Sequence, residues 1–466
     1  MSILLVCDEK STKLGRFCRW STHYSSSNTV AKEGIIQFAL AKLRNFTKVT
    51  KVREIEGAIE IPKEQRHAHL AALGVCVLFD FERVHAAQRL QMDLIASNMR
   101  IVWSMNDRRE YVVGGYPCEP ILAVAALHHL HEVNQEGERY RSLSVMRDAV
   151  VQRHISKGEG GELVARLILI LAFHSTLFFP AARSTPNREY PTMHIPSVPV
   201  WEFLRKLLPS ESYLNEFRKM GPCRGGNPKH TAATVFEKAK VYFTHFVRWA
   251  ETPDAKDLWT AVVRGHAIQC MPQQEEVDII IPIILDPTAQ LTDKHMSAIL
   301  IQVRNRSSLA TAYPNGDKMK LFATTEIPYI SIIFQLGMND KGKENKHTCA
   351  HVANDQAVVV IPNSPSHTMT LRSRPTPNPP SHTIHPRPTP KRGGQYRIDI
   401  RGCSSKSFGA INPDEDKLFK EMLTSQDIVE CHPRQSEEHI NAVAALKPYW
   451  KHSNSVPPRA DLTPAP

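Results

Sequence analysis

Short apolar runs alternate with stretches of helical periodicity along the first 140 residues. The predicted strands are "ILLVC" (3–7), "LGVCVLFDF" (73–81) and "MRIVWSM" (99–105), and the predicted helices are "SNTVAKEGIIQFALAKL" (27–43) and "ERVHAAQRLQMDLIASN" (82–98). Strands that alternate with helices in this way are typical of α/β proteins. We therefore expect residues 1–140 to form an N-terminal α/β segment.

Helical periodicity dominates the next hundred residues. The predicted helices are "EPILAVAALHHLHEV" (119–133), "GEGGELVARLILILAFHST" (158–176), "VWEFLRKLL" (200–208) and "HTAATVFEKAKVYFTHFVRWA" (230–250). The second of these is apolar on nearly all faces, which predicts a helix buried between layers. Glu162 lies in its first turn, where a carboxylate suits the helix dipole.

Dense β-branched runs then predict a central sheet. The predicted strands lie in "EEVDIIIPIILD" (275–286), "SAILIQVRNR" (297–306), "PYISIIFQL" (328–336) and "YRIDIRGCSSKSFGAI" (396–411), and "PDEDKLFKEMLTS" (413–425) is a predicted helix. Pro282 indicates a strand near the edge of its sheet. The expected fold class is α/β, with a mixed central sheet flanked by helices.

Proline divides the second half of the chain. Nine of the 33 prolines fall between residues 362 and 390, in a stretch without Asp or Glu. Such a segment buries too little apolar surface to offset the entropy of ordering it. We expect a core over 155–345, a disordered basic Pro-rich insert over 346–394, a strand and helix over 395–450 that complete the core, and a disordered tail over 451–466.

The charge balance points to an anionic partner. The chain has 58 Lys and Arg against 47 Asp and Glu, a net charge of +11. DNA or RNA is the usual partner of such a chain, although a solvated basic surface gives the same excess.

Cysteine and glycine patterns exclude several classes of site. The nine cysteines form no CxxC pair, so neither a disulfide framework nor a zinc site is indicated. No G-x-x-x-x-G-K-[ST] occurs, and the glycine pairs at 114–115, 160–161 and 225–226 lack a predicted strand-to-helix setting, so we expect no nucleotide site.

Apolar runs long enough for a membrane or a signal peptide are also missing. The stretch "LVARLILILAFHSTLFF" (163–179) contains Arg166 and His174 and is too short to span a bilayer, and the N-terminal apolar run is too short for a signal peptide. An intracellular protein of the nucleus or cytoplasm, without a membrane, is the expectation.

Four polar residues could hydrolyse a phosphodiester. Asp278 opens one predicted strand, and Gln302 and Arg304 lie two residues apart on the next, with Val303 facing the core between them. A magnesium ion uses one or two carboxylates together with other oxygens, and Glu162 could supply the second acid. The alternative is structural: Asp278 and Arg304 form an ion pair at the rim of the sheet, with Gln302 beside them.

Several of these stretches resemble a known family. "GELVARLILILA", "RGHAIQC", "VDIIIPI", "SAILIQVRN" and "YRIDIRGCSS" resemble the PD-(D/E)XK, or restriction-endonuclease-like, domains of proteins multiplied in mushroom-forming fungi. These proteins are related in layout to the Crinkler and retrotransposon-hot-spot types, in which an ATPase half precedes the nuclease-like half. "GYPCEPILAVAA" (115–126) looks like the end of that first half, so the resemblance implies that residues 1–140 are a truncated ATPase-like module.

The resemblance also implies roles for the four residues. Asp278 would be the metal-binding acid, Gln302 would stand where the family has Glu, Asp or Gln, Arg304 would stand where it usually has Lys and would contact the scissile phosphate, and Glu162 would be the helix acid. The implied cofactor is Mg²⁺, held by Asp278, Gln302 and Glu162.

Two departures from the family pattern weaken the implied chemistry. Gln302 offers a neutral oxygen, and Arg304 is a permanently protonated fork that cannot exchange a proton with water as Lys can. The implied function is therefore a nucleic-acid-binding protein with a degenerate Mg²⁺-dependent phosphodiesterase site. The alternative is a catalytically dead scaffold of mobile-element or effector lineage that binds nucleic acid or protein.

Overall fold

The computed structural model describes residues 53–55, 58–60, 63–98, 100–108, 111–116, 120–135, 139–156, 158, 161–177, 197–271, 277–288, 292, 295–306, 313–337, 357–358 and 393–424. The strand predicted at 3–7, the helix predicted at 27–43 and the tail over 451–466 lie outside these residues.

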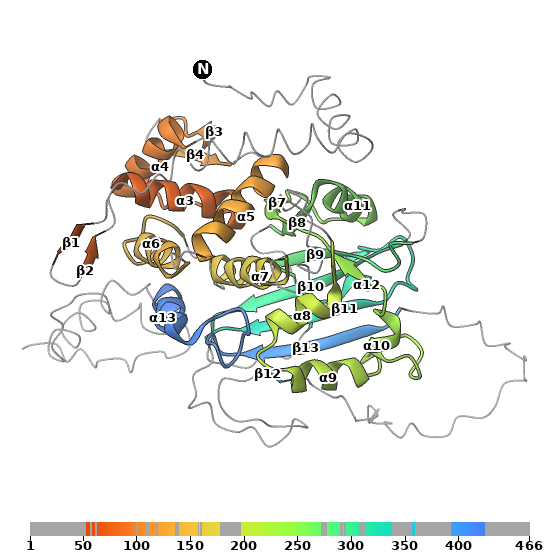
Figure 1. Ribbon diagram of the computed structural model, residues 1–466. Coiled ribbons are helices and arrows are strands. Elements are labelled where there is room, and N and C mark those ends of the chain that lie inside the picture. The colour runs from red at the N-terminus through yellow and green to blue at the C-terminus, as the bar shows by residue number, and fades with distance from the viewer. Residues whose placement is uncertain are drawn as a thin grey trace, which may run out of the picture.

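A nine-stranded mixed sheet forms the centre of the molecule (Figure 1). Its strands are β5 (Val198–Pro199), β6 (Lys240–Val241), β7 (His245–Arg248), β8 (His266–Gln269), β9 (Ile279–Ile284), β10 (Met296–Arg304), β11 (Tyr329–Gln335), β12 (Ala357–Val358) and β13 (Gln395–Arg401). The order is β12-β13-β11-β10-β9-β6-β5, and β8 pairs with both β9 and β7. β10, β11 and β13 are parallel, whereas β9 runs antiparallel to β10. The mixed α/β class expected from the sequence is confirmed.

Strand alternation divides the apolar residues between two cores. Ile279 and Ile301 point into the larger core, and Ile280 and Leu300 point into the smaller core on the opposite face. Because both faces of β9 and β10 are covered, their sequences are apolar at nearly every position.

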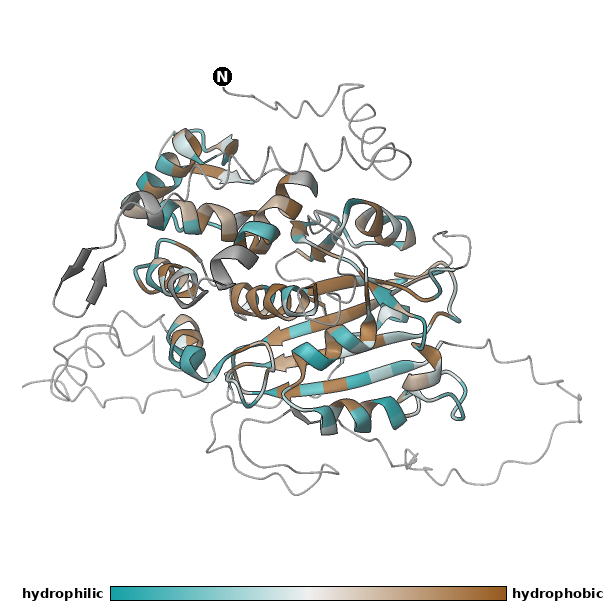
Figure 2. Cartoon of the chain, viewed as in Figure 1, coloured by the Kyte–Doolittle hydropathy of each residue, from teal (hydrophilic) through white to brown (hydrophobic). Residues whose placement is uncertain are grey.

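Helices cover both faces of the sheet. The larger core includes residues of α7 (Glu162–Leu177), α8 (Val200–Leu207), α9 (Glu211–Lys219) and α10 (Ala232–Val235), and the smaller core is packed by α11 (Ala255–Arg264) and α12 (Gly316–Met319). All residues of α7 from Leu163 to His174 are buried, as expected for a helix that is apolar on nearly all faces (Figure 2).

The described part of the N-terminal segment packs on α7. It contains β1 (Arg53–Ile55), β2 (Ala58–Glu60), α3 (Lys63–Val77), α4 (His85–Ser97), β3 (Ile101–Met105), β4 (Val112–Gly115) and α5 (Pro120–Gln135), and α6 (Arg139–Val151) follows it. Leu73, Leu127 and Met146 belong to the same apolar core as α7 and the sheet. The chain ends its described part with the 3-10 turn η3 (Pro413–Glu415) and helix α13 (Asp416–Thr424).

Most predicted elements are confirmed. The predictions that hold are those for α4, α5, α7, α8, α13, β3 and the strands β9, β10, β11 and β13. Within the predicted insert, Ala357–Val358 form β12 and pair with β13, and most of the remainder lies outside the described residues.

Two secondary-structure predictions are wrong. The run at 73–81 continues α3 as far as Val77 and ends in a loop. The prediction failed because the periodicity of a short, fully buried apolar run does not distinguish a helix from a strand. The helix predicted at 230–250 is instead α10 followed by β6 and β7, where β-branched and aromatic residues such as Val241, Phe246 and Val247 favour strands.

Proline and glycine positions also need correction. β9 is a central strand and not an edge strand. Its first residues pair with β8 and its last residues pair with β6, and Pro282 lies between these two sets. No neighbouring strand on that side of β9 therefore loses a hydrogen bond because proline has no N–H. Gly114 and Gly115 are the last residues of β4, the strand before α5, but the space beside Gly115 is filled by the ring of Trp103. Among the described helices, none is long and apolar enough to cross a bilayer.

Candidate functional site

Asp278 lies immediately before β9 and is tied into the sheet by its backbone and its side chain. Its backbone amide donates to the carbonyl of Ile301 at 2.9 Å, and its own carbonyl accepts from Cys270 at 2.9 Å. Its carboxylate Oδ2 accepts from the backbone amide of Val303 at 2.7 Å. The side chain of Asp278 thus adds one hydrogen bond to those that join β9 and β10, just before β9 begins.

The pKa of Asp278 shows which charges surround it. Burial raises this pKa to about 6, the hydrogen bond from Val303 lowers it, the charge of Glu162 raises it, and the charges of Arg304 and Arg166 lower it. Two acids and two arginines therefore act on one another at this edge of the sheet.

Gln302 and Arg304 lie at the carboxyl end of β10. The antiparallel pairing of β9 with β10 ends with Ile279 opposite Ile301, and the amide of Asp278 bonds to the carbonyl of that same Ile301, one residue before Gln302. Gln302 is 7% exposed and Arg304 is half-buried, while Val303 points into the larger core. The expected alternation within β10 is confirmed: Val303 lies on the face of the larger core, and Gln302 and Arg304 lie on the face of the smaller core, as Leu300 does.

Glu162 reaches the same edge from the first turn of α7. A Cβ placed on Gly161 would meet Leu336 at 3.3 Å and Asn305 at 3.7 Å, so the helix begins beside the carboxyl ends of β10 and β11. Gly158 has φ +78°, and a Cβ there would lie 1.9 Å from Oε2 of Glu162. The glycine therefore lets the backbone pass directly against the Glu162 carboxylate.

A buried arginine behind the site was not predicted as functional. Arg166, one turn after Glu162, is 4% exposed, and its Nε and Nη2 donate to the carbonyls of Val77 at 2.8 Å and Leu78 at 2.9 Å. Burial lowers the pKa of Arg166 to about 10, against the opposing charges of Asp80, Glu162 and Asp278.

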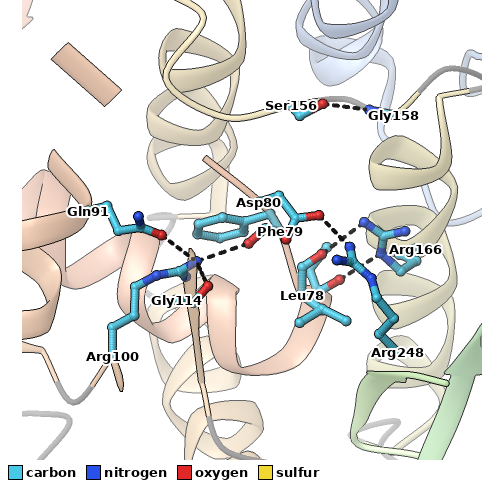
Figure 3. A network of polar contacts seen from close by, with 11 residues as sticks. Leu78, Phe79, Asp80, Gln91, Arg100, Gly114, Ser156, Gly158, Arg166 and Arg248 are labelled. Atoms are coloured by element: carbon cyan, nitrogen blue, oxygen red, sulfur yellow. Dashed lines mark hydrogen bonds and ion pairs between the residues drawn. The ribbon is translucent and has the colours of Figure 1, made fainter. Parts of the chain in front are cut away.

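An ion pair and a second buried arginine continue this network (Figure 3). Arg248 on β7 pairs with Asp80, in the loop that follows α3. Arg100 is 2% exposed and donates to the carbonyls of Phe79 and Gly114. The sequence does contain a signal for this network: Arg166 is a charged residue inside an apolar helix, and a buried charge needs partners. In the sequence, Arg166 served only as an argument against a membrane-spanning helix.

The donors at the site suit a magnesium ion better than a closed metal cage. Within the described ranges, no group of three or more His, Cys, Asp or Glu side chains is arranged to hold a metal. Magnesium requires only one or two carboxylates, with water completing its shell. Asp278 and Glu162 meet that requirement, and the hydrogen bond from Val303 occupies only one oxygen of Asp278.

The structural alternative takes a different form from the one expected. The carboxylate of Asp278 is hydrogen-bonded to the Val303 backbone and not to Arg304, whose guanidinium acts on it through charge. Asp278 therefore caps the β9–β10 ladder, a role that requires neither metal nor substrate.

Comparisons with protein-family models, curated proteins and solved structures found no match to this chain.

Proposed function

We propose that this chain binds nucleic acid through a restriction-endonuclease-like PD-(D/E)XK core with a degenerate Mg²⁺-dependent phosphodiesterase site. The observation that carries the proposal is that α7 begins beside the carboxyl ends of β10 and β11, so that the Glu162 carboxylate adds to burial in raising the pKa of Asp278. A carboxylate whose charge is disfavoured by burial and by a neighbouring carboxylate is stabilised when a cation neutralises it.

Each residue has a separate role in the proposal. Asp278 and Glu162 hold the metal with their carboxylates, and Gln302 adds its amide oxygen. When bound, Mg²⁺ neutralises charge on the phosphate and lowers the pKa of its water. Arg304 binds the scissile phosphate but cannot take up a proton from the attacking water, so turnover is slow.

The second candidate is a catalytically dead scaffold that binds nucleic acid or a protein. The neutral Gln302 and the permanently charged Arg304 favour it, because they remove one ligand charge and one proton-exchanging group from the family pattern. In this version Asp278 keeps only its role in capping the ladder between β9 and β10.

Cleavage and binding assays with one variant separate the two candidates. Labelled DNA and RNA are incubated with the purified chain or with Asp278→Asn, with and without Mg²⁺ or Mn²⁺. The nuclease proposal expects slow, metal-dependent cleavage by the wild type and none by the variant. Binding without cleavage by either protein supports the scaffold, and no binding to either nucleic acid at low salt rejects the nuclease and leaves only a scaffold that binds protein.

A further inference from the structure

A row of arginines lies near the carboxyl ends of the parallel strands, on the face of the sheet that the smaller core covers. Arg304 on β10 is in register with Gln335 on β11, and Gln335 is in register with Arg401 on β13. Residues in register across a sheet point to the same face, so Arg401 lies roughly 10 Å from Arg304, two strand spacings away. Arg397 shares that face and lies about 13 Å along β13 from Arg401.

Arg401 is held in place by a buried carboxylate. Its Nε and Nη2 donate to Oδ2 of Asp399 at 3.1 and 2.9 Å, and Nε2 of Gln335 donates to the other carboxylate oxygen at 2.5 Å. Asp399 is 2% exposed, whereas the Arg401 side chain is 24% exposed. The guanidinium is therefore fixed on its inner side, and Nη1 makes no hydrogen bond within the described part of the chain.

Arg397 is fixed in a similar way by uncharged groups. Its Nε and Nη2 donate to Oε1 of Gln395 at 3.2 and 2.8 Å, and its guanidinium lies 4.7 Å from the ring centre of Tyr313. Gln395 is itself anchored, since its Nε2 donates to the carbonyl of Pro314 at 2.6 Å and to Ser331 at 3.0 Å. Here too Nη1 makes no hydrogen bond among the residues that the structure describes.

We propose that Arg397 and Arg401 bind backbone phosphates of a nucleic acid and lead its strand along β13 towards Arg304 at the carboxyl end of β10. Two guanidiniums whose inner donors are occupied, and whose Nη1 groups have no partner among the described residues, are preorganised for an outside acceptor. The row spans a distance that one DNA strand covers with several phosphates, at about 3.4 Å of helix axis each. This inference rests on the proposed function, because it names the contacts that hold the same substrate.

The local charge supports an anionic partner. The one acid on β13, Asp399, is already paired with Arg401, while Arg306 is exposed just beyond β10. Contacts of this kind carry no base specificity and bind DNA and RNA alike.

Two variants remove these contacts, and each has a matched control on the helices of the other face. Arg397→Gln removes a guanidinium stacked on an aromatic ring, and Arg218→Gln does the same on α9, where Arg218 lies 5.3 Å from the ring centre of Trp201. The double variant Asp399→Asn with Arg401→Gln removes an ion pair at constant net charge, and Arg205→Gln with Glu211→Gln removes the pair on α8 and α9. The amide that replaces the Asp399 carboxylate keeps an oxygen that can accept from Gln335.

Binding of a fluorescent oligonucleotide is measured by anisotropy in EDTA over a series of salt concentrations. We expect each β13 variant to lose about five- to tenfold in affinity and its slope of log K against log salt to flatten by about one per lost phosphate contact. The controls are expected to stay within about twofold of wild type. Thermal unfolding checks each fold, and Arg397→Gln decides the question by itself if the double variant does not fold.

Each outcome bears on the inference. If the wild type binds but both β13 variants keep its affinity and slope, the inference is wrong and the proposed function stands. If the wild type binds no nucleic acid, both are wrong. Loss of binding to poly-aspartate with unchanged oligonucleotide binding would assign the row to an acidic protein partner and overturn it.

Discussion

The carboxylate of Asp278 accepts a hydrogen bond from the backbone amide of Val303 at 2.7 Å and so extends the β9–β10 ladder. The same half-buried carboxylate has a pKa raised to about 6 by burial and by Glu162. One side chain thus supports the sheet through an oxygen acceptor and weakens it through its charge. The two effects can be separated by substitution.

Asp278→Asn is expected to stabilise the protein at pH 7. The amide oxygen can still accept from Val303, while the charge is gone, so the free energy of unfolding should rise by about 1–2 kcal/mol. Asp278→Ala removes the acceptor as well and should be about 1–3 kcal/mol less stable than Asp278→Asn. Urea denaturation measures both. Equal stability of the two variants would mean that the Val303 hydrogen bond contributes nothing.

The advantage of Asp278→Asn should depend on pH and on Mg²⁺. Below about pH 4 the carboxyl is protonated in both folded and unfolded wild type, so its charge costs nothing there. Between pH 4 and 6 only the unfolded chain loses the proton, so wild-type stability falls relative to the variant until the folded pKa of about 6 is passed. If Mg²⁺ binds at Asp278, it should reduce the difference in stability between Asp278→Asn and wild type above pH 6. Denaturation at pH 4, 5 and 7.5 with and without Mg²⁺ tests this, and a gap that does not vary with pH contradicts it.

The sheet was predictable from sequence because its strands are buried on both faces. Their β-branched runs are long and distinct, and the alternation of Gln302, Val303 and Arg304 follows from strand geometry alone. That the strand after Asp278 neighbours the strand of Gln302 was expected from sequence, and β9 does pair with β10. What strand periodicity cannot give is strand order, so the central position of β9 was missed.

The surroundings of the site could not be predicted, because they join residues far apart in the chain. Arg166 meets carbonyls 88 and 89 residues away, and Arg248 meets Asp80 across 168 residues. No local pattern encodes such contacts. The loop after α3, which contains Asp80, was also not predicted, because the apolar run at 73–81 favoured a strand.

Arg166→Met should destabilise the protein strongly. It leaves the carbonyls of Val77 and Leu78 buried without their donor, and each unsatisfied group costs about 1–3 kcal/mol, so a loss of about 2–4 kcal/mol is expected. Arg89→Met on the exposed side of α4 is the control and should change stability by less than about 0.5 kcal/mol. Urea denaturation compares them, and similar values for the two variants would show that the carbonyls find other donors.

His245 and His266 should make the fold acid-sensitive. They are in register on β7 and β8, and burial lowers the pKa of His245 to about 3 and that of His266 well below its usual range. As pH falls below about 6.5 the unfolded chain binds protons that the folded chain does not, so the stability present above that pH is lost progressively. His266 is 1% exposed and stacks on Trp249. His266→Phe should therefore lose less of its melting temperature between pH 7 and 5 than wild type, and an equal loss would contradict this.

Gly158→Ala should act on the site without replacing any of its four polar residues. Alanine is strained at φ +78°, and its Cβ would lie 1.9 Å from Oε2 of Glu162, so the carboxylate must move away. Because the charge of Glu162 raises the pKa of Asp278, that pKa should fall in the variant. NMR titration of the Asp278 carboxyl measures it, with Glu162→Gln as the control that removes the charge and leaves the backbone unstrained. Both variants should lower the pKa, and Gly158→Ala should also cost about 1–2 kcal/mol of stability. A folded Gly158→Ala protein with the wild-type pKa, beside a lowered value in Glu162→Gln, would mean that the loop gives way instead of the carboxylate.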